Sequence, residues 1–325
     1  MTMTLPKIVF LDAATFGDVS LARFSEIGHC RIYQVTQPGE TIGRLAGQSI
    51  VVTNKRSIDQ AALAAPESRN LSLIAVAATG TDIIDHTAAR QRGIKVCNVP
   101  GYAAQSVAQF TMALILELAT HAGRYASDVK AGMWQKSPIF SLLTYPIVEL
   151  NGKTLAIIGY GNIGREVGRM ARSFGMEVVV AARPGAAEPH EPDRVPLEQL
   201  LPRADIVSLH CALTPQTKNL IDGEMLKLMK PSALLINTAR GALIDESALI
   251  QALREQRLAA AALDVISEEP PASDHPIILA ASALDNLLVT PHTAWSARQA
   301  RERLLDEVAE NIAAFLAGRD RNRVA

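Results

Sequence analysis

The chain carries the sequence LAIIGYGNIG at residues 155–164, an apolar run followed by three glycines spaced G-x-G-x-x-G. The run predicts a buried strand, and residues 163–174 predict the helix that follows it. The first glycine permits a tight turn, the second lets a ligand approach the backbone, and the third lets the helix pack on the sheet. The stretch therefore predicts a Rossmann-type dinucleotide site formed by Gly159, Gly161, Asn162, Ile163 and Gly164, with phosphate at the helix N-terminus. The alternative is a tight turn without a ligand.

Aliphatic runs alternate with helical patterns on both sides of this stretch. The runs before it predict strands at residues 8–11, 50–52, 73–76 and 95–97, followed by a long helix at 103–130. The runs after it predict strands at 178–180, 206–209, 234–237, 261–265 and 287–289, and a last helix at 296–316. Repeated βα units build parallel sheets. The predicted fold class is therefore α/β with two doubly wound parallel-sheet domains, and the proline-rich residues 184–196 predict a surface loop.

Composition excludes several classes of protein. The formal net charge of −1 argues against a surface built to bind nucleic acid or an anionic membrane. The three cysteines lie far apart and predict neither a disulfide framework nor a metal site. The N-terminus lacks the pattern of a signal peptide, and no apolar run is long enough to span a membrane. We therefore expect a cytoplasmic protein.

The strand at residues 178–180 ends without the acidic residue that an NAD site usually places on the ribose hydroxyls. Ala182 and Arg183 follow it instead. Without a carboxylate nothing repels a ribose 2′-phosphate, and a guanidinium can bind that phosphate through two hydrogen bonds. We therefore expect NADP to be preferred, or NADP and NAD both to be used. The alternative is a solvated Arg183 in a site that tolerates either cofactor.

Three polar residues, Arg240, Glu269 and His292, each come a few residues after a predicted strand of the second series. Because ligands bind at the carboxyl ends of parallel strands, the three can meet in one site. Arginine binds a carboxylate through two hydrogen bonds, histidine exchanges a proton near neutral pH, and a carboxylate on its second nitrogen orients the ring. The combination suits reduction of a 2-keto acid. Taken singly, Arg240 could pair with Asp245, Glu269 could be a solvated loop acid, and His292 could cap the last helix.

The other histidines carry weaker signals. His210 ends the strand predicted at residues 206–209, and we expect it to line the cofactor cleft. The remaining five have no acidic or metal-like pattern around them, so we interpret them as structural or solvated: His29, His86, His121, His190 and His275. No zinc pattern appears, and no metal is expected.

Ordered motifs extend along nearly the whole chain. They are AATGTD at 77–82, NVPG at 98–101, GYGNIG at 159–164, LHCALT at 209–214, NTARG at 237–241, DVISEEP at 264–270 and PH at 291–292. With these motifs the chain resembles the D-isomer-specific 2-hydroxyacid dehydrogenase family, and it looks most like the glycerate dehydrogenases, also called hydroxypyruvate reductases. The resemblance implies NAD(P)H-dependent, reversible reduction of hydroxypyruvate and glyoxylate to the D-2-hydroxy acid. The alternatives are a family activity on lactate, phosphoglycerate, formate or phosphite, or a nucleotide-sensing binding module.

The resemblance also implies a role for each site residue. Arg240 would bind the substrate carboxylate, His292 would be the acid in reduction and the base in oxidation, and Glu269 would pair with His292. The backbone N–H groups of Thr79 and Gly80 would hold the carboxylate from the other domain. The remaining cofactor contacts would come from Ala182, Arg183, His210, Thr238, Ala239 and Asp264, of which Asp264 holds the nicotinamide carboxamide while Thr238 and Ala239 border its ribose.

The family's domain order implies a nucleotide domain inserted into a substrate domain. We expect the Rossmann-type dinucleotide-binding domain at residues 102–292 and the flavodoxin-like substrate domain at 1–101 plus 293–325. The family is usually dimeric, so a homodimer is expected. Residues 121–149, with Trp134, Phe140 and Tyr145, are the candidate dimer arm, and the alternative places those aromatic side chains in the core.

Overall fold

The computed structural model describes residues 5–183 and 194–325. The chain divides into two compact units, unit 1 being Met1–Ala103 with Ser296–Ala325, and unit 2 being Ala104–Trp295. The divisions expected from the sequence, after residue 101 and before residue 293, lie slightly earlier than these. Three features discussed above lie outside the described residues: positions 184–193 of the predicted surface loop, His190 within it, and the first four residues of the N-terminus.

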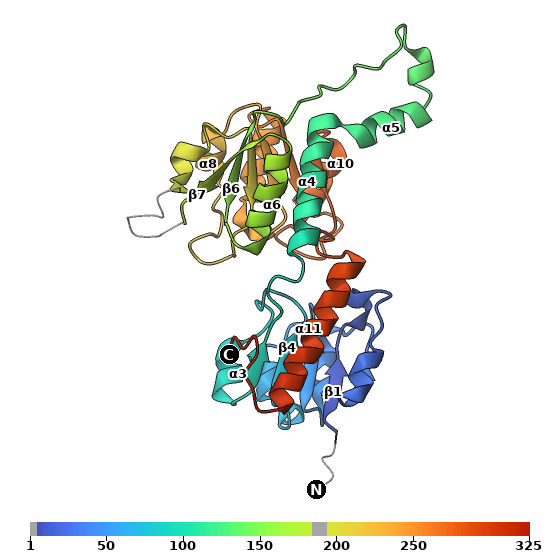
Figure 1. The fold of residues 1–325 in the computed structure, drawn as a ribbon, viewed down its shortest axis with the longest axis vertical. Coiled ribbons are helices and arrows are strands. Elements are labelled where there is room, and N and C mark those ends of the chain that lie inside the picture. The colour runs from blue at the N-terminus through green and yellow to red at the C-terminus, as the bar shows by residue number, and fades with distance from the viewer. Residues whose placement is uncertain (1–4, 184–193) are drawn as a thin grey trace. The chain divides into compact units, whose positions relative to one another are not determined.

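Unit 1 is built on a five-stranded parallel sheet in the order β2-β1-β3-β4-β5 (Figure 1). Its strands are β1 (Lys7–Phe10), β2 (His29–Ile32), β3 (Ile50–Thr53), β4 (Leu73–Val76) and β5 (Lys95–Cys97). The central strands β3 and β4 are buried along their whole length, as their aliphatic sequences predict. The sequence did not predict β2, because this edge strand is largely exposed and its residues HCRI form no apolar run.

The helices of unit 1 are α1 (Thr41–Leu45), α2 (Gln60–Ala64), α3 (His86–Gln91) and α11 (Arg298–Leu316). Asp59 and Asp85 accept hydrogen bonds from first-turn N–H groups of α2 and α3, which explains where these helices begin. The last helix, α11, packs against β4. After it, the N–H of Val324 donates to the carbonyl of Val96 at 2.8 Å, so the chain ends beside β5.

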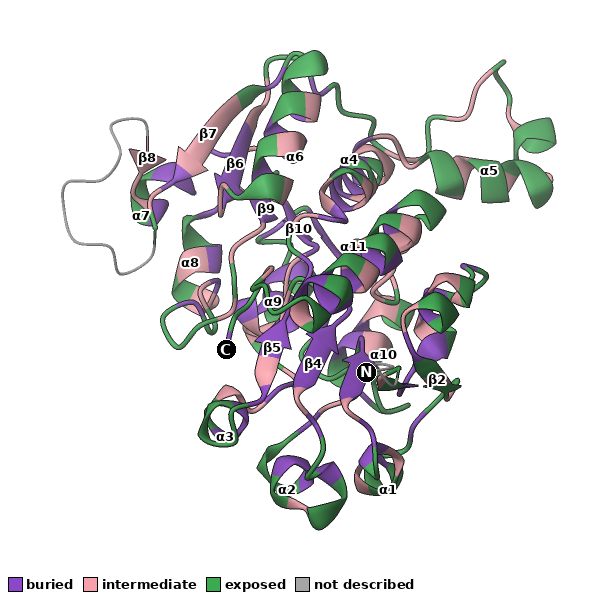
Figure 2. Ribbon diagram, turned by 60° about the horizontal axis from the view of Figure 1, so that its bottom comes forward, coloured by how far each residue is buried: buried purple, intermediate pink, exposed green. Residues whose placement is uncertain are grey.

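Unit 2 contains a seven-stranded parallel sheet in the order β12-β11-β10-β9-β6-β7-β8. Its strands are β6 (Thr154–Ile158), β7 (Glu177–Ala181), β8 (Arg194–Val195), β9 (Ile206–Leu209), β10 (Leu234–Asn237), β11 (Ala260–Leu263) and β12 (Leu287–Val289). The strand order reverses between β6 and β9, and a crevice for ligands forms at the carboxyl ends of such a pair. Figure 2 shows buried residues concentrated in the strands of both units. The predicted α/β class with two parallel sheets is confirmed.

The helices of unit 2 are α4 (Ala104–Thr120), α5 (Ala122–Lys130), α6 (Asn162–Ser173), α7 (Leu197–Leu200), α8 (Gly223–Leu228), α9 (Glu246–Arg254) and α10 (Pro276–Ala283). The prediction of one helix over 103–130 is wrong. His121 has a φ of 52°, and this left-handed backbone separates α4 from α5. α4 buries one face, whereas α5 buries no residue and projects from the rest of unit 2 (Figure 1). Within the described ranges, no helix has the length and apolar character that crossing a membrane requires.

Candidate active site

The three glycines of the fingerprint lie where β6 turns into α6, and each meets a different constraint. Gly159 has a φ of 97°, and a Cβ there would lie 2.4 Å from the backbone nitrogen of Cys211. A Cβ on Gly164 would lie 2.2 Å from the Gly159 carbonyl oxygen. A Cβ on Gly161, in contrast, would meet nothing within 4 Å. Packing therefore explains Gly159 and Gly164, while Gly161 leaves the open approach to the backbone that a pyrophosphate needs.

The N-terminus of α6 suits an anion. Its first-turn N–H groups have no intrahelical acceptor, and the N-cap residue Gly161 has no side chain to satisfy them. The helix dipole adds to the attraction for phosphate. At the end of β7, Ala182 donates its N–H to the carbonyl of Val195 at 2.8 Å, and Arg183 is exposed. These residues fit a dinucleotide, and no carboxylate at residues 178–183 repels a 2′-phosphate.

His210 and Cys211 follow β9 and pack against Gly159 at the point where the strand order reverses. The Nε2 of His210 lies 2.9 Å from the hydroxyl of Ser208. Burial lowers the pKa of His210 to about 3, so its ring is neutral at physiological pH. Burial also raises the pKa of the Cys211 thiol to about 11, which keeps the thiol protonated. Both side chains therefore present uncharged surfaces beside the glycine turn.

Arg240, Glu269 and His292 follow β10, β11 and β12, which are neighbours in the sheet. The Nδ1 of His292 lies 2.5 Å from Oε2 of Glu269, and Oε1 of Glu269 accepts the N–H of Ile266 at 3.0 Å. With Nδ1 engaged, Nε2 is the ring nitrogen left for a ligand. Arg240 is half-buried and donates from Nη1 to the Ala239 carbonyl at 2.8 Å. A carboxylate-paired imidazole and a guanidinium thus lie at one edge of the sheet.

Asp264, which is 1% exposed, anchors the loop that carries His292. Its Oδ1 accepts from the Thr290 hydroxyl at 2.6 Å and the Thr293 N–H at 2.9 Å, and its Oδ2 accepts the Ala294 N–H at 2.8 Å. Three hydrogen bonds from residues 290–294 thus converge on one buried carboxylate. The sequence did not predict the anchoring role. The only indication in the sequence was that an acidic residue stands in an apolar stretch. Such a carboxylate needs several hydrogen-bond donors when it is buried.

Thr238 and Ala239 lie between β10 and Arg240. The Thr238 hydroxyl is 3.0 Å from the Thr111 hydroxyl of α4, and the Ala239 N–H donates to Oδ1 of Asn237 at 3.0 Å. The Thr238 hydroxyl therefore contacts α4, which packs beside the end of β10.

Comparison with known proteins decides the family. A family model described as D-isomer specific 2-hydroxyacid dehydrogenase, NAD binding domain, matches residues 112–294. The chain belongs to the D-isomer-specific 2-hydroxyacid dehydrogenase family. Glycerate dehydrogenase of Methylorubrum extorquens is 41% identical over 322 residues, covering 98% of this chain and 98% of that protein. Hydroxypyruvate reductase of Blautia hydrogenotrophica is 36% identical over 319 residues, covering 96% and 97%. The solved structure of the TT0316 protein from Thermus thermophilus has a TM-score of 0.85 at 34% identity, covering 98% and 100%.

The family resemblance inferred from the motifs is thus confirmed. The protein is an NAD(P)-dependent D-2-hydroxyacid dehydrogenase, and its cofactor is a nicotinamide nucleotide. The NAD-binding family model includes the glycine turn at Gly159–Gly164 and all three of Arg240, Glu269 and His292. The glycine turn and the three polar residues of this dehydrogenase therefore lie within one matched domain, and they follow strands of one sheet.

Thr79 and Gly80 of the dehydrogenase follow β4 in unit 1. The Thr79 hydroxyl donates to the Val99 carbonyl at 2.9 Å, and Nδ2 of Asn98 donates to the Thr79 carbonyl at 2.7 Å. These bonds hold the loop in place and leave the backbone N–H groups of Thr79 and Gly80 outside them. The loop belongs to unit 1 and Arg240 to unit 2.

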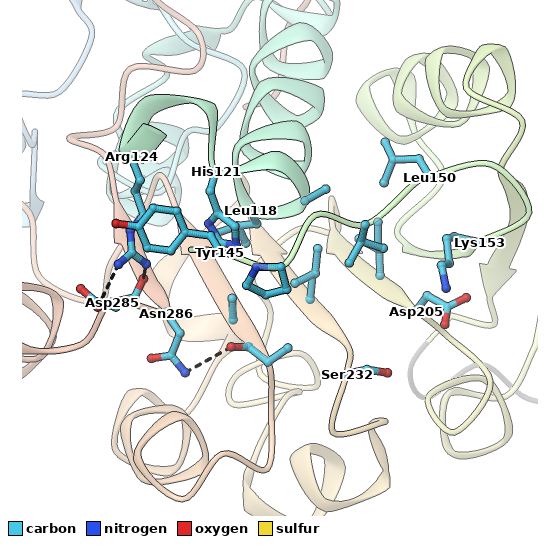
Figure 3. A pocket seen from close by; sticks show the side chains of 17 residues that line it. Leu118, His121, Arg124, Tyr145, Leu150, Lys153, Asp205, Ser232, Asp285 and Asn286 are labelled. Atoms are coloured by element: carbon cyan, nitrogen blue, oxygen red, sulfur yellow. Dashed lines mark hydrogen bonds and ion pairs between the residues drawn. The ribbon is translucent and has the colours of Figure 1, made fainter. Parts of the chain in front are cut away.

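A cavity of about 330 Å³ lies at the opposite edge of the second sheet of the dehydrogenase. Its floor includes the first residues of three strands, Ile206, Leu234 and Ala260, and Tyr145 and Arg124 cover one side of it (Figure 3). The Arg124 guanidinium stacks 4.1 Å from the centroid of the Tyr145 ring. Because ligands of parallel sheets bind at the carboxyl ends of strands, this cavity at the amino ends is not the substrate site.

His275 has the structural role expected of it, because its Nδ1 accepts the N–H of Ile277 at 3.3 Å and so caps α10. The expectation that no acidic residue surrounds it is wrong, since its Nε2 lies 3.8 Å from Oε2 of Glu246. The sequence could not show this contact, because 29 positions separate 246 from 275 along the chain. Across residues 5–183 and 194–325, no group of three or more His, Cys, Asp or Glu side chains is arranged to hold a metal ion.

Proposed function

We propose that this dehydrogenase reduces hydroxypyruvate to D-glycerate, and glyoxylate to glycolate, in a reversible reaction. The observation that carries the proposal is the 2.5 Å contact between Glu269 and His292 beside Arg240, at the sheet edge that also bears the glycine turn. The choice of substrate is supported by two relatives that cover nearly the whole chain, one named glycerate dehydrogenase and the other hydroxypyruvate reductase.

Each polar side chain has a defined task in this reaction. The Arg240 guanidinium binds the substrate carboxylate through two hydrogen bonds and fixes its orientation. His292 donates the proton on Nε2 to the carbonyl oxygen during reduction and recovers it during oxidation. Glu269 holds Nδ1 and stabilises the protonated ring. A bound nicotinamide supplies the hydride that reaches the carbonyl carbon.

The remaining contacts complete the proposed site. The backbone N–H groups of Thr79 and Gly80 hold the substrate carboxylate from unit 1. Asp264 binds the nicotinamide carboxamide, and the backbone of Thr238 and Ala239 borders the ribose. The imidazole of His210 provides an uncharged wall for the cofactor, because its low pKa keeps the ring neutral.

A substrate panel tests the proposed activity. With NADPH in excess, hydroxypyruvate is expected to give the highest kcat/KM among hydroxypyruvate, glyoxylate, pyruvate and 3-phosphohydroxypyruvate, measured by loss of absorbance of the reduced cofactor. Oxidation of formate and phosphite is tested with NADP and NAD. A lead by pyruvate, phosphohydroxypyruvate, formate or phosphite would replace the proposed substrate, and no turnover at all would favour a nucleotide-sensing module.

We further propose that NADPH is the preferred cofactor, because Ala182 and Arg183 stand where an acidic residue would otherwise repel a 2′-phosphate. The wild-type enzyme is expected to have a higher kcat/KM with NADPH than with NADH. In Ala182→Asp the preference is expected to change to NADH, with the ratio of the two kcat/KM values shifted by at least about tenfold, which corresponds to ~1.4 kcal/mol. Arg183→Ala should weaken NADPH use alone. Arg169→Ala, which removes an exposed arginine of α6 paired with Glu166, is the control. A strong wild-type preference for NADH would contradict the proposal.

We also propose a homodimer joined through residues 121–149. This arm exposes a series of large apolar side chains: Val129, Met133, Trp134, Ile139, Phe140, Leu143, Ile147 and Val148. Phe140 is 92% exposed and Leu143 77% exposed, which is costly in water unless a partner covers them. The mostly apolar cavity at the base of the arm offers a second copy a matching surface, and a two-fold pair would use arm and cavity twice.

Substituting charged residues into the arm tests the proposed dimer. The wild-type protein is expected to be a dimer by light scattering at micromolar concentration, and the double variant Phe140→Asp/Leu143→Asp is expected to be a folded monomer. The reason is that two buried, unpaired carboxylates would oppose association. Val35→Asp, at a site in unit 1 that is 59% exposed, is the matched control and should remain dimeric. A monomeric wild-type protein would refute the proposal.

A further inference from the structure

One carboxylate near the proposed site has no part in the chemistry described above. Glu246 is the first residue of α9, and its side chain is 14% exposed. Its Oε1 accepts the N–H of Ser267 at 2.6 Å, and its Oε2 accepts the Ser267 hydroxyl at 2.8 Å. Both carboxylate oxygens therefore hold the same residue.

The residue that Glu246 holds belongs to the turn that carries Glu269. Within this turn, Ile266 donates its N–H to Oε1 of Glu269 at 3.0 Å, and Oε2 of Glu269 lies 2.5 Å from His292. Two carboxylates thus hold two consecutive peptide units of the turn. The Val265–Ile266 unit donates its N–H to Glu269, which pairs with His292, and the Ile266–Ser267 unit donates its N–H to Glu246.

A second contact fixes the same peptide from the neighbouring strand end. A Cβ built on Gly241 would lie 1.9 Å from the carbonyl carbon of Ile266 and 2.3 Å from the nitrogen of Ser267. Gly241 directly follows Arg240, so the peptide packs against the backbone that carries the guanidinium. Glu246 and Gly241 together determine where this peptide sits relative to Arg240.

The charge of Glu246 is compatible with its partial burial. The residue stands at the N-terminus of α9, where the helix dipole stabilises a negative charge. Two hydrogen bonds from Ser267 satisfy one lone pair on each oxygen. His275, whose side chain is 7% exposed, lies 3.8 Å from Oε2 and closes the site on the side of α10.

From these contacts we infer that Glu246 is a positioning residue for the acid–base pair of the dehydrogenase. It clamps Ser267, and thereby the turn, so that Glu269 meets Nδ1 of His292. The inference rests on the proposed function of Glu269 and His292. It adds a residue that touches neither substrate nor cofactor but sets the alignment of the proton donor.

Removing the clamp tests the inference. Glu246→Ala is expected to lower kcat by about 10- to 100-fold, because a misplaced Glu269 no longer orients His292, while KM and the Kd for NADPH change less than about threefold. Glu246→Gln is expected to recover most of kcat, since its amide oxygen accepts the Ser267 N–H and its NH₂ donates to the Ser267 hydroxyl. Ser267→Ala, which keeps the backbone bond, should have an intermediate effect. Glu255→Ala, at the other end of α9, is the matched control.

A double-variant cycle separates positioning from general damage. In a Glu269→Gln background, Glu246→Ala is expected to lower kcat by less than about twofold further, because the group that it positions is already lost. Equal losses in both backgrounds would overturn the inference, as would an unchanged kcat in Glu246→Ala. If Glu246→Ala does not fold, the same comparison is made with Ser267→Ala. A Glu269→Gln variant with normal kcat would instead refute the proposed function itself.

Discussion

Replacing His292 with glutamine is expected to lower kcat for hydroxypyruvate reduction by about 10²- to 10⁴-fold, the range for loss of a positioned general acid. Glutamine can hydrogen-bond to Glu269 but cannot deliver a proton to the carbonyl oxygen. The Kd for NADPH should stay within about threefold, because the glycine turn lies after β6 and His292 after β12. Steady-state kinetics and fluorescence titration of NADPH measure the two effects separately.

Two further variants serve as controls for this result. His292 has a φ of 53°, which asparagine tolerates better than glutamine, so His292→Asn should show the same loss of kcat without added backbone strain. His29→Gln, at an exposed position of β2, is the control for loss of a histidine. Substantial turnover in both His292 variants would show that another group supplies the proton. It would also revive the interpretation of His292 as a structural cap.

The glycine turn supports the second large prediction, in which two alanine substitutions three residues apart have different outcomes. Gly164→Ala is expected to lower the free energy of unfolding by about 1–3 kcal/mol and to weaken cofactor binding, because its Cβ would lie 2.2 Å from the Gly159 carbonyl oxygen. Gly161→Ala should leave the Tm unchanged, since its Cβ would meet nothing within 4 Å. It should still raise the Kd for NADPH by at least about tenfold by filling the approach to the backbone.

Thermal unfolding and NADPH titration distinguish these outcomes. Gly168→Ala, one turn further along α6, is a graded control, because its Cβ would lie 3.2 Å from Cδ1 of Ile157 and needs only a small shift. If Gly161→Ala binds NADPH as tightly as the wild-type protein, the cofactor does not approach the backbone at Gly161. The placement of the pyrophosphate at this turn would then be wrong.

The sequence predicted the strands that carry the site, because each is a short aliphatic run in a parallel sheet. Among them, β4, β9 and β11 are buried along their whole length. It did not predict β2, whose edge position requires no apolar residues. It also joined α4 and α5 into one helix, because His121 adopts a left-handed backbone without a glycine or proline to mark the break.

For the site as well, the sequence predicted some residues and not others. The sequence predicted that Arg240, Glu269 and His292 each follow a strand, and the structure places them after three neighbouring strands of one sheet. The residues that hold them were not predicted. Asp264 was expected at the cofactor, and nothing in the sequence indicated that its hydrogen bonds also hold the loop of His292. Nothing in the sequence pointed to Glu246, because its partner Ser267 is distant along the chain and serine is a common residue in loops.

By itself, the sequence LAIIGYGNIG determined that a strand turns tightly into a helix and that a dinucleotide can approach the turn, because strand, glycines and helix are adjacent in the chain. The tertiary structure decided which glycines serve packing and which one leaves the backbone open. Gly159 meets Cys211 and Gly164 meets the carbonyl of Gly159, while Gly161 meets nothing. It also decided that Glu269 pairs with His292, because only the pairing of β10, β11 and β12 in one sheet brings those strand ends together.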